Sequence, residues 1–188
     1  MPSVPEAGLS DSLVSALVER ARSESPRDEV FGGQGFHPSL SQEALEQAQA
    51  TLGLRLPLAV RDLYGRVANG GFGPGYGIIG LVGGFLSDLK KDVVEEYKLR
   101  RGDGPWNEGP EWPMAILPIC HWGCAIYSCV DCAEPATRIV RFDPNPVDGD
   151  WSIAWGDEGY TLEGWLAAWL DGTELFVSGT PPNAYPDA

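Results

Sequence analysis

The segment from Leu52 to Gly73 constrains the fold more than any other part of this 188-residue chain, because it signals the end of one helix and the whole of a second. Pro57 suits a first helical turn, where the amide hydrogen that proline lacks would have no helical partner. Asn69, Gly70 and Gly71 predict the end of the second helix, since Asn and Gly adopt the left-handed conformation that closes helices. The apolar stripes expected on these helices are Leu40, Ala44, Leu45, Ala48 and Leu52 on the first, and Val60, Leu63, Tyr64 and Val67 on the second.

Further helices are predicted on both sides of this segment. Leu9 to Arg22 has helical apolar spacing, and Ser39 with Gln42 three positions later is a capping-box pattern for the helix over 40–52. Leu86 to Arg100 indicates a charged helix, whose basic end suits the helix dipole. Leu162 to Leu170 has the strongest apolar stripe and predicts a closing helix.

Between the last two helices the pattern changes to that of short β-strands. The predicted strands are Ala115–Cys120, Cys124–Val130 and Thr137–Phe142, with Trp151–Trp155 as a candidate fourth and Tyr76–Val82 as a separate, glycine-containing one. Helices at both ends of a contiguous sheet predict a single α+β domain, in which a central antiparallel β-sheet is flanked by N-terminal helices and a C-terminal helix.

The composition indicates a globular chain with 43% hydrophobic residues. We expect residues 1–37 to form an N-terminal helical extension and link, residues 38–172 to form the α+β domain, and residues 173–188 to form a loose, Pro-rich tail. No apolar run reaches the length of a membrane span, and the N-terminus has no signal-peptide pattern. We therefore expect a cytoplasmic protein with reduced cysteines.

The net charge of −14 is unevenly distributed: residues 142–188 contain nine acidic side chains and no Lys or Arg. Such a field repels nucleic acid and anionic membranes, so neither is expected as a partner. It would attract a basic protein, although a charge that only maintains solubility is an equally good interpretation. The acidic residues that we single out as candidate partner contacts are Asp148, Asp150, Asp157 and Glu158.

Two tryptophans, Trp106 and Trp112, lie in a Gly/Pro-rich loop over 102–112. An exposed Trp often anchors a protein interface, so both are candidate partner contacts. The alternative is that they pack their own loop against the domain.

Residue types that could support catalysis or metal binding do not converge in the sequence. Cys120, Cys124, Cys129 and Cys132 could bind zinc, but Cys124 and Cys129 would point to opposite faces of a regular strand. His121 is adjacent to Cys120, and adjacent strand residues point apart, which disfavours a nucleophile–base pair. The acidic run over 143–150 lacks the ligand positions of a calcium loop. We expect no catalytic residues, no metal and no cofactor.

The order of signals in the opening segment resembles a known family. A helix, then LG-x-x-LP, then a helix containing Leu-Tyr, then NGG-x-G is similar to the start of the SUKH superfamily (Smi/Knr-like proteins). The likeness continues through Ile116-Leu117-Pro118-Ile119, Gly123 and Tyr127, and then through Leu162-Glu163-Gly164-Trp165-Leu166, covering roughly residues 38–172. The motif residues, which we interpret as fold-defining and not catalytic, are Leu56, Pro57, Tyr64, Asn69, Gly70 and Gly71.

The resemblance implies a non-enzymatic intracellular immunity protein that binds and neutralises the toxin domain of a polymorphic toxin system. The acidic surface would suit a basic toxin domain, such as one that acts on nucleic acid. The main alternative is a regulatory or scaffold protein-binding module of the same fold, and a third is a small zinc-binding or hydrolytic enzyme. A neighbouring gene for a large secreted protein with a C-terminal toxin domain would favour the first.

Overall fold

An antiparallel sheet organises the chain, and its strands follow one another in sequence order, β1-β2-β3-β4-β5. The computed structural model describes residues 6–23, 37–103, 112–133, 135–176 and 183–184. The strands are β1 (Ile116–Gly123), β2 (Ile126–Asp131), β3 (Arg138–Phe142), β4 (Trp155–Thr161) and β5 (Asn183–Ala184). The helices are α1 (Asp11–Ser23), α2 (Gln42–Leu52), α3 (Leu58–Asp62), α4 (Val93–Lys98) and α5 (Leu162–Leu170), with the shorter turns η2 (Leu63–Val67), η3 (Leu99–Asp103) and η4 (Trp151–Ala154).

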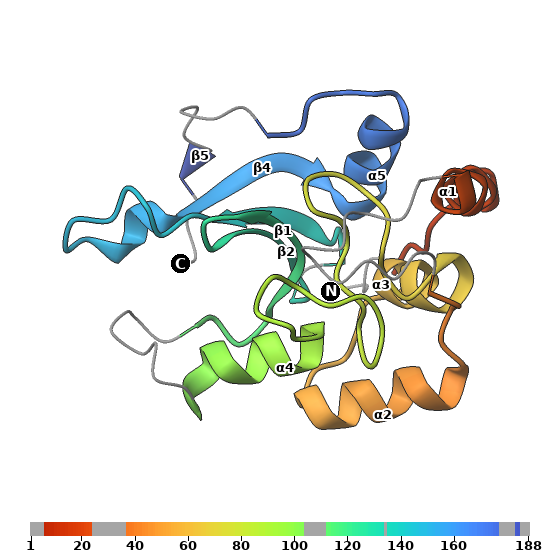
Figure 1. The fold of residues 1–188 in the computed structure, drawn as a ribbon, viewed down its shortest axis with the longest axis horizontal. Coiled ribbons are helices and arrows are strands. Elements are labelled where there is room, and N and C mark those ends of the chain that lie inside the picture. Colours follow the sequence, from red (N-terminus) through yellow and green to blue (C-terminus); the bar gives the residue numbers. More distant parts are fainter. Residues whose placement is uncertain (1–5, 24–36, 104–111, 134, 177–182, 185–188) are drawn as a thin grey trace, which may run out of the picture.

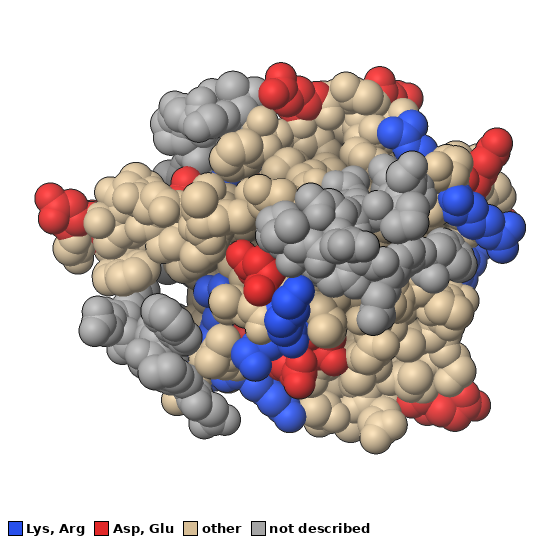
Figure 2. Space-filling model, in the orientation of Figure 1, with Lys and Arg blue, Asp and Glu red and all other residues tan. Residues whose placement is uncertain are grey.

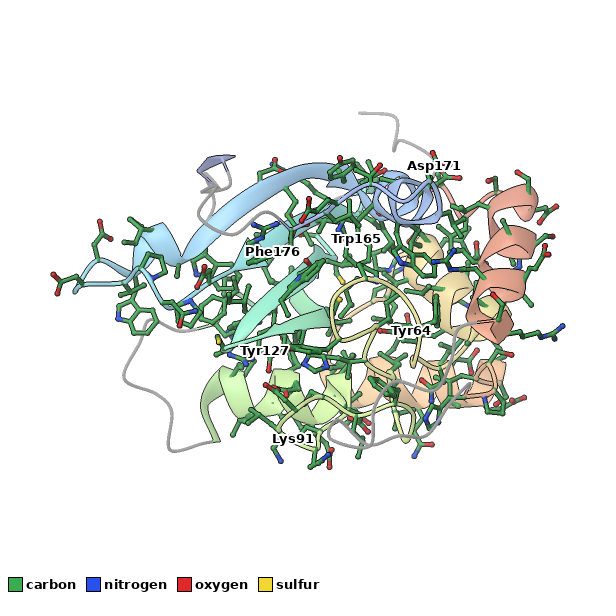
Figure 3. The ribbon with its side chains drawn as sticks, turned by 45° about the horizontal axis from the view of Figure 1, so that its top comes forward. Tyr64, Lys91, Tyr127, Trp165, Asp171 and Phe176 are labelled. Carbon is green, nitrogen blue, oxygen red and sulfur yellow. The ribbon has the colours of Figure 1, made fainter. Side chains whose placement is uncertain are left out.

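The two faces of the sheet carry different neighbours. Tyr127 of β2 points toward α4 and η3, where the Arg100 guanidinium lies 4.2 Å from its ring centroid. Trp165 of α5 lies over the opposite face, and Figure 3 shows Tyr127 and Trp165 on these two sides. Helices α1, α2 and α3 lie beside the sheet, at the right of Figure 1. One hydrophobic core joins all of these elements, so the chain is a single α+β domain.

The N-terminal helix α1 is part of that core. Leu17 is fully buried, and Val14 and Ala21 on the same helix face are also buried. Helix α1 contacts both η2 and α5. Residues ahead of the α2–α3 segment therefore share the core of the sheet domain.

The motif segment forms the predicted pair of helices, with local differences. Helix α2 is capped by Ser41, whose hydroxyl accepts a hydrogen bond of 3.2 Å from the Ala44 amide, so the capping box expected at Ser39 is wrong. Gly53 closes α2 with a φ of 67°. The second helix begins after Pro57 and widens into the π-helical turn η2. The motif residues Leu56, Pro57, Tyr64 and Asn69 are buried.

Asn69 holds the glycine-rich segment that follows the second helix. Its side-chain oxygen accepts a hydrogen bond of 2.8 Å from the Leu81 amide, and its side-chain nitrogen donates one of 2.9 Å to the Val82 carbonyl. Gly70 and Gly71 both have positive φ, at 82° and 85°. A strand was expected over 76–82, but the pairing of this segment with the sheet is one isolated bridge between Ile78 and Cys120.

The charged helix expected over 86–100 is shorter than predicted. Asp92 and Glu95 form a capping box, so α4 begins at Val93. The preceding residues form a tight turn in which the Ser87 amide donates to the Lys91 carbonyl at 2.9 Å. Leu89, within the predicted helix, instead lies in this turn and is 45% exposed.

Candidate functional site

The most exposed acidic side chains of the candidate set lie in the connection between β3 and β4. We call residues 143–150 the acidic loop; within it Asp148 and Asp150 are exposed. The loop and η4 form the protrusion at the left of Figure 1, and Figure 2 shows acidic side chains at its end. A protruding loop with two unburied carboxylates can reach a partner before the rest of the surface does.

Hydrogen bonds at its base hold the acidic loop in place. The Asp143 amide donates to the Ala154 carbonyl at 2.8 Å, which closes the loop. The Asn145 side chain donates to the Cys124 carbonyl at 3.0 Å, which joins the loop to the turn between β1 and β2. These contacts fix the direction of the loop relative to the sheet.

Asp150 also has a local structural role. Its carboxylate accepts hydrogen bonds from the amide and the hydroxyl of Ser152, at 3.0 and 2.7 Å, and thereby caps η4. The same two bonds lower the pKa of Asp150, first through the Ser152 hydroxyl. The side chain therefore stays ionised over a wide pH range, as an electrostatic contact requires.

The other two acidic candidates do not join this surface. Asp157 of β4 is half-buried and lies 3.5 Å from the Arg138 guanidinium. The Glu158 side chain is only 2% exposed, so its assignment as a partner contact is wrong. Adjacent residues of a strand point to opposite faces, and Glu158 takes the face that α5 covers.

Glu158 is the centre of a buried polar network on that face. Its carboxylate accepts hydrogen bonds from the Ser128 hydroxyl at 2.6 Å and from the Trp165 indole at 3.1 Å, and it lies 3.4 Å from the Arg141 guanidinium. Burial raises the pKa of Glu158, while these donors and the guanidinium oppose the shift. A carboxylate so enclosed has its hydrogen bonds satisfied inside the fold and is not accessible to a partner.

A second buried network lies on the α4 face. The Ser87 hydroxyl donates to the Glu96 carboxylate at 2.5 Å, and the Tyr127 hydroxyl donates to the same oxygen at 3.3 Å. The Arg100 guanidinium is 3.5 Å from the other Glu96 oxygen. Burial raises the pKa of Glu96, against the opposing effects of Ser87 and Arg100. This network attaches the turn at Ser87 to the sheet.

The two tryptophan candidates have different outcomes. Trp112 is 4% exposed, and its indole donates a hydrogen bond of 2.7 Å to the Ile116 carbonyl. Its ring packs at 5.0 Å from Phe142 and 4.8 Å from Trp155, measured between centroids. Its assignment as an exposed interface anchor is therefore wrong, and the alternative, packing of its own segment against the domain, holds for Trp112. Trp106 lies outside the described residues.

The cysteines do not meet at one point. Cys120 and Cys129 are buried, whereas Cys124 is exposed in the turn between β1 and β2. Across residues 6–23, 37–103, 112–133 and 135–176, no group of three or more His, Cys, Asp or Glu side chains could hold a metal ion. Within the same ranges, no helix has the length and apolarity needed to cross a bilayer.

The sequence analysis missed the residues that surround Glu158. Trp122 lies between the predicted strands Ala115–Cys120 and Cys124–Val130, but β1 continues to Gly123 and the turn is at Cys124 and Ala125, which both have positive φ. Trp122 then points onto the sheet, where its indole donates to Ser128 at 2.9 Å. The available sequence signal was a charged residue, Arg141, between two apolar residues of a predicted strand, and the structure shows that it is buried.

The comparisons with known proteins agree with this fold. Residues 39–167 match the SMI1 / KNR4 family (SUKH-1). The matched range begins just before α2 and ends within α5, and therefore includes the motif helices, α4 and strands β1 to β4. No curated protein matches the chain.

Proposed function

The chain belongs to the SMI1 / KNR4 family (SUKH-1), and on this premise we propose that it is a noncatalytic immunity protein that neutralises the toxin domain of a polymorphic toxin system. We further propose that it acts in the cytoplasm, through a protein partner. The functional domain would be residues 38–172, with residues 1–37 as a helical extension and residues 173–188 as a tail.

The observation that carries the proposal is the exposed, fixed acidic loop. Asp148 and Asp150 present exposed carboxylates within the protruding loop, and the loop is tied to the sheet by Asp143 and Asn145. Carboxylates held in this way can occupy the basic surface that a nucleic-acid-acting toxin uses for its substrate. Inhibition would result from occlusion, which requires no catalytic residue on this chain.

The test is association with a basic toxin domain encoded beside this chain. Reversal of Asp148 and Asp150 to Lys should lower the association rate about tenfold at about 50 mM salt, because steering by the acidic loop is lost. At about 500 mM salt the difference should nearly disappear, since screening removes the same attraction from the parent.

A matched control reverses two exposed acidic residues elsewhere. Asp171 follows α5 and Glu19 lies on α1, both at the opposite end of the molecule from the acidic loop. Reversal of this pair changes the net charge equally and should leave the rate within about twofold of the parent. Equal rates for both variants would refute the role of the acidic loop. Failure of the parent to protect cells that produce the toxin domain would instead favour the regulatory or scaffold module.

A further inference from the structure

The chain continues past α5 across the same face of the sheet. The Leu175 carbonyl accepts a hydrogen bond of 3.1 Å from the Arg141 guanidinium, and the Phe176 ring lies over β1 and β3 side chains. Farther along, β5 pairs with β4 through Gly156–Ala184 and Asp157–Asn183. We call residues 173–176 together with 183–184 the C-terminal strap. Figure 3 shows Phe176 on the side of the sheet where Trp165 lies.

Phe176 occupies a slot made by two side chains. Its ring stacks on the Trp122 indole, with centroids 5.2 Å apart and an interplanar angle of 23°. The Arg141 guanidinium carbon lies 4.7 Å from the Phe176 centroid. A flat indole beside a guanidinium is an environment that favours an aromatic ring over an aliphatic side chain.

Residues beneath the slot hold both of its side chains, and the C-terminal strap adds one hydrogen bond, which the Leu175 carbonyl accepts from Arg141. The Trp122 indole donates to the Ser128 hydroxyl at 2.9 Å, and that hydroxyl donates to Glu158 at 2.6 Å. Glu158 also neutralises Arg141, from a distance of 3.4 Å. Because Ser128 and Glu158 still hold Trp122 and Arg141, the slot would keep its geometry when the strap leaves, and the Arg141 donor that Leu175 uses would become available to another main-chain carbonyl.

The described residues of the C-terminal strap are at most partly buried over 173–176. Phe176 and Leu175 are half-buried, and the residues between α5 and Leu175 are exposed. Its pairing with the sheet is a strand of two residues. Partly buried segments near a chain end open locally at a lower free energy than global unfolding requires.

The contacts of the strap are those of a bound extended peptide: one aromatic ring in a slot, one main-chain carbonyl on an arginine and a short ladder at a sheet edge. We propose that the slot and the β4 edge form a peptide-binding site, that the strap occupies this site in cis, and that an extended partner segment with an uncharged aromatic side chain replaces it. The aromatic side chain of the partner is expected to be uncharged, because Glu158 already neutralises the Arg141 guanidinium and no further negative charge is needed there. This site is separate from the acidic loop and goes beyond the proposed function.

The test uses a labelled synthetic peptide of residues 173–188 as the probe and measures its binding by fluorescence anisotropy. In the parent, the tethered strap competes at an effective concentration on the order of millimolar, so the probe should bind weakly. Phe176→Ala removes the ring of the tethered copy and should strengthen probe binding at least about tenfold. Ile153→Ala, which truncates an exposed apolar side chain of η4 outside the slot, should leave it unchanged.

Two further measurements identify the slot. A probe with Ala in place of its Phe should not bind the Phe176→Ala protein, and Trp122→Ala in that background should abolish binding of the original probe. If Phe176→Ala does not fold, Phe176→Leu keeps apolar bulk over the network, and a smaller gain in probe affinity is expected. Equal probe affinity for the parent and for the folded Phe176 variant would overturn the proposal, as would full binding of the Ala-substituted probe.

Discussion

Gly70 lies against the backbone of Gly80, so closely that a Cβ atom at position 70 would stand 2.6 Å from the Gly80 nitrogen. The same atom would be 2.6 Å from the Ile78 carbonyl oxygen, and φ at Gly70 is 82°. Both the conformation and the contact therefore require glycine. We predict that Gly70→Ala lowers the free energy of unfolding by about 3 kcal/mol, measured by chemical denaturation.

Gly53→Ala is the matched control for that substitution. Gly53 has a similar φ of 67°, but a Cβ atom there would meet nothing within 4 Å. Its cost should be limited to backbone strain of about 1 kcal/mol. Equal losses for the two variants would show that the approach of Gly70 to Gly80 contributes nothing.

The buried Glu96 carboxyl predicts a pH dependence of stability. Burial raises its pKa in the folded state, so the folded chain binds this proton more tightly than the unfolded chain. The resulting stability is present below the ordinary glutamate pKa and is lost as the pH rises through the raised value. We predict that Glu96→Gln makes the denaturation midpoint less dependent on pH between about pH 4 and pH 8.

Glu19→Gln is the control. Glu19 is exposed on α1, so this substitution removes one carboxylate without affecting a buried site. It should keep the slope of the parent. Identical slopes for the parent and Glu96→Gln would contradict the assignment of this titration to Glu96. The pH slope of the midpoint is compared, and not the midpoint itself, because the amide also changes the contacts with Ser87 and Arg100 and so shifts the stability at every pH.

The cysteines should differ strongly in reactivity. Cys124 is exposed, whereas burial raises the pKa of Cys132 to about 12 and that of Cys129 well above the ordinary thiol value. Because the thiolate is the reactive form, a thiol reagent at neutral pH should modify one cysteine per chain rapidly. We predict that Cys124→Ser removes this fast phase and that Cys132→Ser retains it. Any fast-reacting thiol left in the Cys124→Ser protein would contradict this assignment.

We expect Trp112 to contribute to the stability of the fold and not to partner binding. Trp112→Phe keeps most of the aromatic packing against Phe142 and Trp155 but removes the hydrogen bond to the Ile116 carbonyl. We expect a loss of about 1–2 kcal/mol in the free energy of unfolding. Partner affinity of the folded variant should not change. A reduced partner affinity with unchanged stability would show that Trp112 contributes to partner binding.

The sequence predicted the fold class and the family, since these depend on local signals. Gly53, Pro57 and the pair Gly70–Gly71 mark helix ends through their own backbone preferences. The start of α4 was missed because the helix was predicted from Leu86, ahead of the capping box formed by Asp92 and Glu95. A capping box satisfies specific amides, so it defines a helix start more directly than spacing does.

The candidate site was less predictable, because it depends on contacts between distant parts of the chain. Asp148 and Glu158 are both acidic residues of the same stretch, yet one is exposed and the other is 2% exposed. The difference arises from Ser128 and Trp165, which approach Glu158 from another strand and from α5. Likewise, nothing near Phe176 in the sequence indicates that Trp122 will stack on it.

The Asn69 side chain accepts a hydrogen bond from the Leu81 amide and donates one to the Val82 carbonyl. This pair of bonds imitates the backbone of a neighbouring β-strand. The consequence concerns the order of events in folding. The segment from Gly70 to Phe85 has no helix of its own, and its amides find this template when the turn at Val67 and Ala68 has brought Asn69 into place. We therefore expect the glycine-rich segment to become ordered only when the helices have placed Asn69, and in the folded protein the Leu81 amide should exchange its hydrogen with solvent as slowly as the helix core does.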